Sequence, residues 1–374
     1  MTALAHFAAA FCVLATGAHL LAQSLTLWRC ARGRLPVRAS TALPPVTIVR
    51  PLCGVDAHEE ATLRSAFTLD YPDYEIILCC ASAGDRVVPL ARRVIAEHPH
   101  VRARLLIGND AVSDNPKLNN IVKGWEAAQH DWIVMADSNV LMPPDYLRRL
   151  AVTWREDTGL VCAPPVGMWP GNFAAELECA FLNTYQASWQ YAADSAGLGF
   201  AQGKTLFWRR DILERLGGVR ALGCEPAEDA AATKLVRAAG LRVRLCDRAS
   251  FQPLGVRALS HVWSRQVRWA RLRRASFPLF FLPEVLTGSV PAVACAALAA
   301  DLWDLEPMFA AMALGLVWYG AEALVAAAGG WHLSWRSPLA WVLRDALLSL
   351  LWISAWIGRG FTWRGNDMQA VRAT

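Results

Sequence analysis

The chain has 374 residues, 55% of them hydrophobic, and its mean hydropathy of +0.25 is high for a soluble enzyme of this length. This balance predicts membrane segments. The net charge of +5 suits an anionic membrane surface or substrate, but it is too small to indicate a nucleic-acid partner. The ten cysteines form neither a CxxC pair nor a zinc-like cluster with histidine, which indicates a reducing, cytoplasmic setting.

Residues 1–28 form an apolar segment that is long enough for one membrane-spanning helix. Its basic residues come after the apolar stretch, at Arg29, Arg32, Arg34 and Arg38. A cleaved signal peptide carries its positive charge before that stretch, so we expect a permanent anchor. The positive-inside rule then places the N-terminus outside and the following domain in the cytoplasm.

Residues 41–275 alternate between apolar strands and helical patterns. Strands are expected over 46–49, 75–80, 101–107 and 132–136, and helices over 57–68, 86–98 and 119–129. This alternation predicts a parallel, doubly wound sheet. The pattern is less regular after residue 160, where helices are expected over 173–193, 211–216 and 229–239 and a strand over 242–246.

Residues 276–358 are apolar again and contain three candidate membrane spans, at 286–302, 308–328 and 338–357. Pro283 and Pro291 favour an interfacial or re-entrant course for the first of them. Three full spans would place the arginines of the tail, residues 359–374, outside the cell, which conflicts with the positive-inside rule. The number of C-terminal spans therefore stays open.

The strand expected over 132–136 runs directly into Asp137, which is followed by Ser138 and Asn139. In open α/β sheets, ligands bind at the edge where parallel strands end. Carboxylate and amide oxygens there are ligands that Mg²⁺ or Mn²⁺ prefers. A metal site on Asp137 and Asn139 is one interpretation, and an Asx turn that closes the strand is the other.

Other charged residues follow different secondary elements, as expected where a site gathers at one sheet edge. Asp85 comes after the second strand, and Glu228 and Asp229 open a helix. An Arg-Gln-Val-Arg-Trp stretch at 265–269 precedes the apolar region. The paired acids also suit the electrostatics of a helix N-terminus, and the arginines also suit a membrane surface.

Taken together, these residues resemble the ceramide glucosyltransferase family, within the inverting, processive-type glycosyltransferases. That group is marked by three aspartates and a (Q/R)xxRW motif. The landmarks match Asp85, Asp137, Asp229, Arg265, Arg268 and Trp269. Further matching stretches are Pro51-Leu52 with Gly54-Val55-Asp56, Leu69-Asp70-Tyr71-Pro72, and Asn115-Pro116-Lys117 with Asn119-Asn120. The resemblance covers almost the whole chain. It implies a GT-A-type α/β fold with a doubly wound mixed sheet, an N-terminal transmembrane helix and C-terminal transmembrane or interfacial helices.

The resemblance also implies roles in binding a UDP-sugar donor. Asp85 would contact the uracil or ribose, and Lys117 would contact the nucleotide as a flexible point charge. Asp137 would hold a divalent cation, Mg²⁺ or Mn²⁺, against the diphosphate, with Asn139 as the second ligand.

The remaining landmarks are implied to act during transfer. Asp229 would be the general base that removes the proton from the acceptor hydroxyl. Arg268 would stabilise the departing diphosphate through its guanidinium fork, and Trp269 would stack near the acceptor or the sugar. Arg265 belongs to the same donor-binding motif.

Three positions depart from the family pattern. Asn139 replaces the second acid of a simple DxD, so the loop would give a metal only one carboxylate. Gln186 stands where animal members have a histidine. Gly203-Lys204-Thr205 also differs from the animal pattern, and Lys204 is either a phosphate contact or a solvated lysine.

We therefore expect a membrane-bound hexosyltransferase, similar to a UDP-glucose:ceramide glucosyltransferase. It would transfer a sugar, glucose first, from a UDP-sugar to a lipid hydroxyl and make a β-linked glycolipid. Ceramide is the first candidate for the acceptor lipid, diacylglycerol is the second and a hopanoid is the third. The expected location is the inner (cytoplasmic) membrane of a bacterium, with the catalytic domain in the cytoplasm. One alternative is a processive polysaccharide synthase, but the candidate spans are too few to build a polymer channel. The other is a transporter or scaffold with a degenerate catalytic domain, and the intact motifs argue against it.

Overall fold

The computed structural model describes residues 1–36, 43–358, 360–363 and 366–369. The chain forms two compact units. The sheet unit comprises Arg32–Trp169 and Ala193–Gly255, and the helical unit comprises Met1–Ala31, Pro170–Ala192 and Val256–Thr374. Parts of the expected catalytic domain, residues 170–192 and 256–275, thus group with the apolar terminal helices. The predicted domain boundaries remain predictions.

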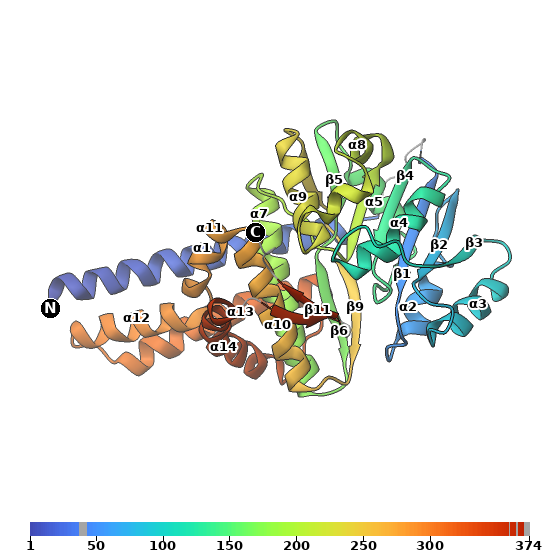
Figure 1. Ribbon diagram of the computed structural model, residues 1–374. Coiled ribbons are helices and arrows are strands. Elements are labelled where there is room, and N and C mark those ends of the chain that lie inside the picture. Colours follow the sequence, from blue (N-terminus) through green and yellow to red (C-terminus); the bar gives the residue numbers. More distant parts are fainter. Residues whose placement is uncertain (37–42, 359, 364–365, 370–374) are drawn as a thin grey trace. The chain divides into compact units, whose positions relative to one another are not determined.

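The sheet unit is built on a seven-stranded mixed sheet with the order β3-β2-β1-β4-β7-β5-β8 (Figure 1). Its strands are β1 (Val46–Leu52), β2 (Tyr74–Cys80), β3 (Arg102–Ile107), β4 (Trp132–Ala136), β5 (Thr158–Cys162), β7 (Thr205–Arg209) and β8 (Arg242–Leu245). The first four strands pair in parallel, whereas β7 runs antiparallel to both β4 and β5. Two further strands, β6 (Pro165–Pro170) and β9 (Ser250–Gly255), pair separately. The strands expected over 46–136 are therefore parallel as predicted, and the mixed sheet that the family resemblance implies is confirmed, with β7 as an antiparallel strand that was not expected.

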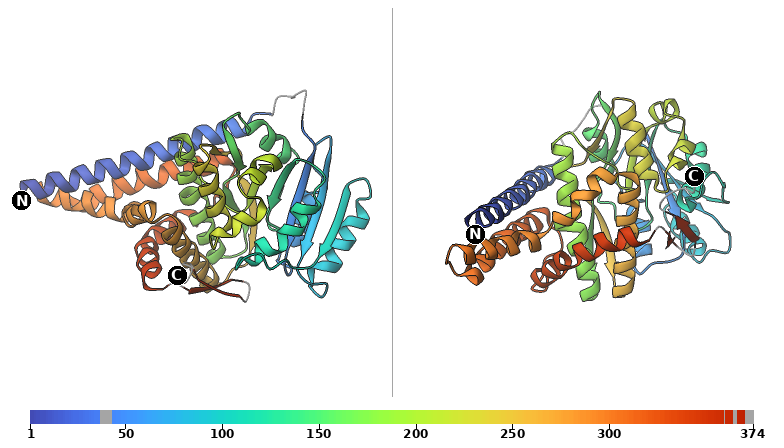
Figure 2. Two further views of the ribbon diagram at one scale, coloured as in Figure 1. Left: turned by 45° about the horizontal axis from the view of Figure 1, so that its top comes forward. Right: turned by 60° about the vertical axis from the view of Figure 1, so that its left-hand side comes forward.

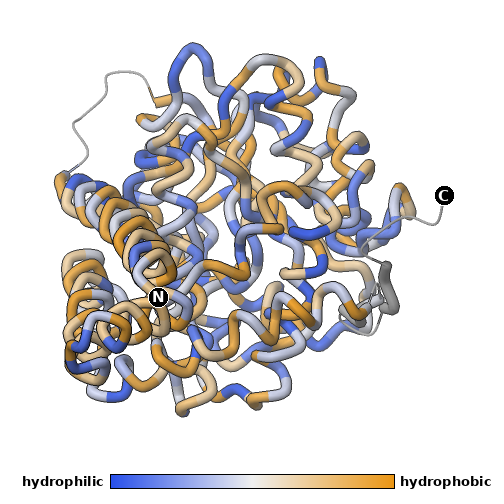
Figure 3. The backbone as a smooth tube through the Cα atoms, turned by 90° about the vertical axis from the view of Figure 1, so that its left-hand side faces the viewer, coloured by the Kyte–Doolittle hydropathy of each residue, from blue (hydrophilic) through white to orange (hydrophobic). Residues whose placement is uncertain are grey.

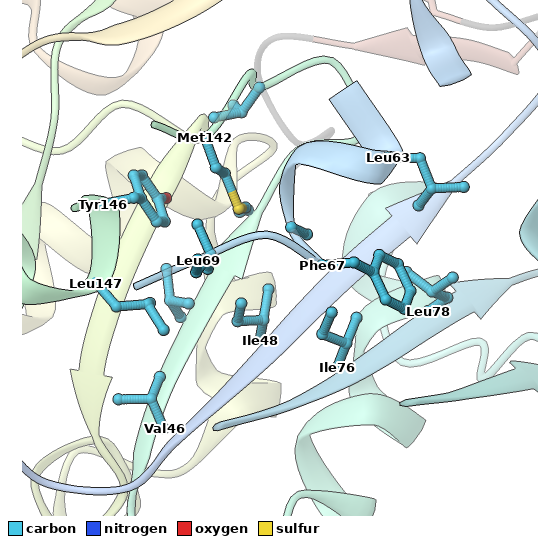
Figure 4. Close-up of a cluster of buried hydrophobic side chains, with 14 of the residues drawn as sticks. Val46, Ile48, Leu63, Phe67, Leu69, Ile76, Leu78, Met142, Tyr146 and Leu147 are labelled. Atoms are coloured by element: carbon cyan, nitrogen blue, oxygen red, sulfur yellow. The ribbon is translucent and has the colours of Figure 1, made fainter. Parts of the chain in front are cut away.

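Helices cover both faces of this sheet and make three layers. One face packs against α2 (Glu59–Ser65), α3 (Val87–Glu97) and α5 (Tyr146–Thr153), as Figure 4 shows for part of this core. The other packs against α4 (Pro116–Ala127), α8 (Arg210–Arg215) and α9 (Glu228–Ala238). Neighbouring residues of one strand alternate between the two cores, so that Ile48 faces the first and Val49 the second. Burial on both faces explains why these strands are continuous apolar runs.

The helical unit consists mainly of long apolar helices and one broken helix. Its elements are α1 (Thr2–Arg34), α6 (Phe173–Ala180), the π-helix η1 (Phe181–Ala187), α7 (Ser188–Ser195), α10 (Leu259–Ser276), α11 (Pro278–Phe281), η3 (Leu282–Leu286), α12 (Ser289–Leu302), α13 (Pro307–Gly329) and α14 (Ser337–Ile357). The helix expected over 173–193 is present, with a π-helical stretch in its middle. The sheet unit also contains the short 3₁₀ helix η2 (Val219–Cys224). Near the C-terminus, β10 (Gly360–Trp363) and β11 (Asn366–Gln369) form an antiparallel pair.

Three helices, α1, α13 and α14, are long and apolar enough to cross a membrane, as the hydropathy colouring of Figure 3 illustrates. Helices α11 to α12 would add a fourth span if the pair, bent by 43°, crosses as one broken segment. Helix α1 lies along α13 (Figure 2), where the rings of His19 and Trp318 stack with centroids 3.8 Å apart. The expected apolar helices at both ends of the chain are therefore present.

A buried ion network joins two of these helices. On α14, the Arg344 Nη2 atom lies 2.8 Å from Glu322 Oε1 of α13, and Arg344 Nε lies 2.7 Å from Asp345 Oδ1. Arg344 Nη1 also donates to Thr184 Oγ1 of η1 at 3.0 Å. Ionisable side chains buried between apolar helices are tolerated when they pair with one another, as these do.

We expect Arg344→Ala to destabilise the helical unit by about 3–5 kcal/mol, because it leaves two buried carboxylates without their cation. Thermal unfolding of the purified protein in detergent measures this loss. The matched control is Arg336→Ala, which removes an exposed guanidinium at the N-cap of the same helix. Equal melting temperatures for the two variants would contradict a stabilising role for the network.

Candidate active site

The candidate site lies at the sheet edge where the parallel strands end. Asp137 follows β4, and Lys204 precedes β7. Because Thr205 of β7 pairs antiparallel with Ala136 of β4, the two charged residues become neighbours. Their main chains are also joined, since the Asp137 N–H donates to the Lys204 carbonyl at 3.2 Å. Strand pairing therefore fixes a lysine beside the aspartate.

Two ammonium groups hold the carboxylate of Asp137. Lys117 Nζ lies 2.6 Å from Asp137 Oδ1, and Lys204 Nζ lies 2.9 Å from Asp137 Oδ2. Lys204 Nζ also donates to Asn139 Oδ1 at 2.8 Å. Burial alone would raise the pKa of Asp137, but the two lysines outweigh it and hold that pKa below its ordinary value. Asp137 is therefore a fixed negative charge.

Lys117 lies in the first turn of α4 and connects three groups. Besides Asp137, its Nζ contacts Glu228 Oε1 and the Gly203 carbonyl, each at 2.6 Å. These contacts use all three donors of the ammonium group. Burial opposes the charged form, but Asp137 and Glu228 raise the pKa of Lys117 above its ordinary value. The lysine thus stays protonated although it is buried.

The two acids that open α9 have different surroundings. Glu228 is tied on both oxygens, because its Oε2 also accepts from Asn115 Nδ2 at 2.7 Å, and Asn115 caps α4. Asp229 instead accepts the main-chain N–H groups of Gly203 and Ala230, each at 2.8 Å. Burial and the neighbouring charge of Glu228 raise the pKa of Asp229 to about 6. A carboxylate of raised pKa is more basic and suits proton abstraction near neutral pH.

Arg50 braces the loop that carries Asp137, and the sequence analysis missed it. This fully buried residue of β1 donates from Nη2 to the carbonyls of Asp137 at 3.0 Å, Ser138 at 2.6 Å and Val140 at 3.0 Å. Its Nη1 donates to the Thr62 carbonyl at 2.7 Å. Burial lowers the pKa of Arg50 to about 10, which keeps it charged at neutral pH. A basic residue inside an apolar strand was the available signal, because buried arginines almost always have specific partners.

Asp85 lies at the same edge of the sheet but outside the lysine cluster. Its carboxylate accepts the N–H groups of Gly54 at 3.0 Å and Val87 at 2.9 Å, and so joins the β1–α2 loop to the start of α3. Gly54 has a φ of 68°, which favours glycine. Strands β2 and β4 flank β1, so their ends are roughly 10 Å apart. Asp85 lies in the loop that follows β2, and Asp137 directly follows β4.

The (Q/R)xxRW residues lie on α10 of the helical unit. Arg265 donates to Glu178 of α6, and its guanidinium lies 4.4 Å from the centroid of the Trp269 ring. Gln186 of η1 donates to Gln266 at 2.9 Å. In this unit Arg265 is thus engaged with an acid and an aromatic ring. A position of Arg265, Arg268 and Trp269 beside the lysine cluster stays a prediction.

The donor set around Asp137 fits one kind of metal ion. The described residues contain no group of three or more His, Cys, Asp and Glu side chains arranged to hold a metal. Mg²⁺ is often bound by one or two carboxylates together with substrate phosphates and water. Asp137 and Asn139 therefore fit an ion that is completed by a diphosphate, and they do not form a metal cage of their own.

The family follows from comparison with known proteins. Residues 10–374 match the model of a protein family that is described as Glycosyl transferase family 21. The chain belongs to this family. It is 25% identical to ceramide glucosyltransferase 3 of Caenorhabditis elegans, over 98% of this chain and 80% of that protein. It is 30% identical to a ceramide glucosyltransferase of Komagataella phaffii, over 63% of this chain but only 59% of that longer protein.

A solved structure supports the fold. The chain resembles a mannosyltransferase from Pyrobaculum calidifontis, determined in complex with GDP-Man and Mn²⁺, with a TM-score of 0.51, 20% identity, and coverage of 93% of this chain and 97% of that one. At this identity the likeness shows the fold alone. The GT-A-type α/β fold, the resemblance to ceramide glucosyltransferases and the prediction of a hexosyltransferase are confirmed. The roles of individual site residues stay predictions.

Gly203 offers a test of how tightly the cluster is assembled. A Cβ atom there would lie 2.6 Å from Glu228 Oε1 and 3.1 Å from Lys117 Nζ. We expect Gly203→Ala to spread the ion pairs and lower the transfer rate by roughly a hundredfold, the order of loss that a misplacement of about 1 Å causes. The control is Gly315→Ala on α13, where the new methyl group meets open space. Wild-type transfer rates in Gly203→Ala would show that the cluster tolerates displacement.

Proposed function

We propose that the protein transfers a hexose, glucose in the first instance, from a UDP-sugar to the hydroxyl of a membrane lipid. The observation that carries this proposal is the combination of two fixed ammonium groups with an aspartate of raised pKa at one sheet edge. Lys117 and Lys204 match the charge of a diphosphate, and Asp229 matches the need for a base. The names of the relatives support ceramide as the acceptor. Diacylglycerol and a hopanoid are the next candidates.

The chemistry uses groups of this chain at each stage. The acceptor hydroxyl attacks the anomeric carbon opposite the leaving UDP, which inverts that centre and gives a β-linked product. Asp229 accepts the hydroxyl proton in the transition state, while Lys117 and Lys204 stabilise the negative charge on the departing diphosphate. A divalent cation held by Asp137 and Asn139 would supply additional charge neutralisation when bound.

The residues outside the lysine cluster complete the proposal. Asp85, in the loop between β2 and α3, would contact the uracil or ribose while the diphosphate lies near Lys117. On α10, Arg268 would stabilise the leaving group and Trp269 would pack against the acceptor or the sugar, with Arg265 supporting that pair through its contact with Trp269.

The membrane helices support a lipid acceptor. Three helices are apolar and long enough to span, and the arginines that follow residue 28 favour a cytoplasmic position for the domain at 41–275. We propose an anchor at 1–28, C-terminal membrane helices within 276–358 and a tail at 359–374. The proposed location is the inner membrane of a bacterium, where the site meets a soluble donor and a membrane acceptor.

The decisive variant for this proposal is Asp229→Asn. It keeps the shape of the side chain but removes the base, so transfer should fall by about a hundredfold to ten-thousandfold while UDP affinity stays near wild type. Transfer to ceramide in lipid nanodiscs is followed by mass spectrometry, and UDP binding by calorimetry.

The wild-type transfer rate should fall as the pH drops below about 6, because protonated Asp229 cannot accept a proton.

Asp211→Asn is the matched control, because Asp211 is an exposed acid near the start of another helix of the same unit. Retention of more than about a tenth of the transfer rate by Asp229→Asn, less than the usual general-base effect, would exclude Asp229 as the base. Glu228 would then be the next candidate. If wild-type protein binds no UDP and glycosylates no lipid of a panel that includes diacylglycerol and a hopanoid, the proposed function itself is wrong.

A further inference from the structure

Lys204 occupies the oxygens that a divalent cation would need. Its Nζ is 2.9 Å from Asp137 Oδ2 and 2.8 Å from Asn139 Oδ1, while Lys117 Nζ is 2.6 Å from the other carboxylate oxygen, Asp137 Oδ1. All the side-chain oxygens of the predicted metal ligands therefore contact an ammonium group. An ion cannot take these positions unless at least one lysine moves.

The residue type at position 204 is unusual for this chain. Only four of its 37 basic residues are lysines, and two of these four contact Asp137. An ammonium group is a compact point charge on a flexible four-carbon stem, whereas a guanidinium group is a planar fork. Lys204 is only 9% exposed, and its main chain is fixed beside β4 by strand pairing. Its stem can therefore change direction while its Cα atom stays in place.

The formal charges of the cluster show when such a movement is favourable. Two lysines accompany three carboxylates, those of Asp137, Glu228 and Asp229, so these side chains carry a formal net charge of −1. A divalent ion alone would compete with two cations for one carboxylate at contact distance, where like charges repel strongly. A diphosphate that binds together with the divalent ion offsets the positive charge that the ion adds to the cluster. It also offers Lys204 new acceptor oxygens.

We propose that Lys204 is a resident cation that holds Asp137 and Asn139 in the empty protein and moves to the donor diphosphate when a divalent cation takes those oxygens. This inference rests on the proposed function, because it assumes a nucleotide diphosphate as the ligand. It makes Lys204 a further donor-binding residue. It also makes metal binding depend on the nucleotide, so the empty protein does not retain the ion.

The test measures Mn²⁺ and UDP binding in full-length protein in detergent, with Lys204→Met as the principal variant. Methionine keeps an unbranched stem without the charge. In the absence of nucleotide, we expect Mn²⁺ affinity, followed by electron paramagnetic resonance, to rise at least tenfold over wild type. At saturating Mn²⁺, UDP affinity should fall by about tenfold to a hundredfold, the loss of one charge-assisted hydrogen bond. Lys234→Met is the matched control, because Lys234 of α9 pairs with Glu225 at 2.6 Å and its loss should change neither affinity.

A second variant keeps the test decisive if Lys204→Met unfolds. Lys204→Gln can still donate to Asn139 but carries no charge, so it should give the same gain in Mn²⁺ affinity. Unchanged Mn²⁺ affinity in the folded variants, or unchanged UDP affinity at saturating Mn²⁺, would overturn the assignment of Lys204. These outcomes are separate from failure of the proposed function, which would show as absent UDP binding by the wild-type protein.

Discussion

The carboxylate of Asp137 lies between two buried ammonium groups, and much of the sheet unit is arranged around this contact. Asp137 directly follows β4, Lys204 directly precedes β7, and Lys117 lies in the first turn of α4. Buried charges are costly unless each is paired and hydrogen-bonded. The free protein therefore cannot leave a bare carboxylate at this edge. The lysines satisfy it, and they also supply the positive charge that an anionic donor needs.

The two neighbouring acids of α9 divide two tasks that one carboxylate could not perform together. Glu228 is committed to Lys117 and to the cap residue Asn115, so it connects α9 with α4. Asp229 accepts main-chain N–H groups and, through burial and the charge of Glu228, has a raised pKa. A structural acid beside a basic one is a common way to assign different roles to similar side chains. Arg50 of β1 holds the loop that carries Asp137 in place, because it donates hydrogen bonds to three carbonyls of that loop.

Much of the fold was predictable from local pattern, but the composition of the site was not. The strand at 132–136 is buried on both faces, and its apolar run identified both the strand and the aspartate at its end. Strand β7 was missed because its short run follows an irregular stretch and its partner is distant in sequence. Without that pairing, nothing placed Lys204 beside Asp137. The contact between Lys117 and Glu228 likewise depends on how α4 and α9 begin at one edge. Arg50 was missed because the first strand was expected to end at Val49.

The most direct measurement is a structure of the full-length protein with UDP and Mn²⁺ bound, in which anomalous scattering locates the manganese. The account predicts manganese on Asp137, the diphosphate within a few ångströms of the buried Lys117 charge, and the Lys204 ammonium on a phosphate oxygen. Manganese or diphosphate bound away from Asp137 and Lys117 would contradict the claim that this charged cluster is the donor site.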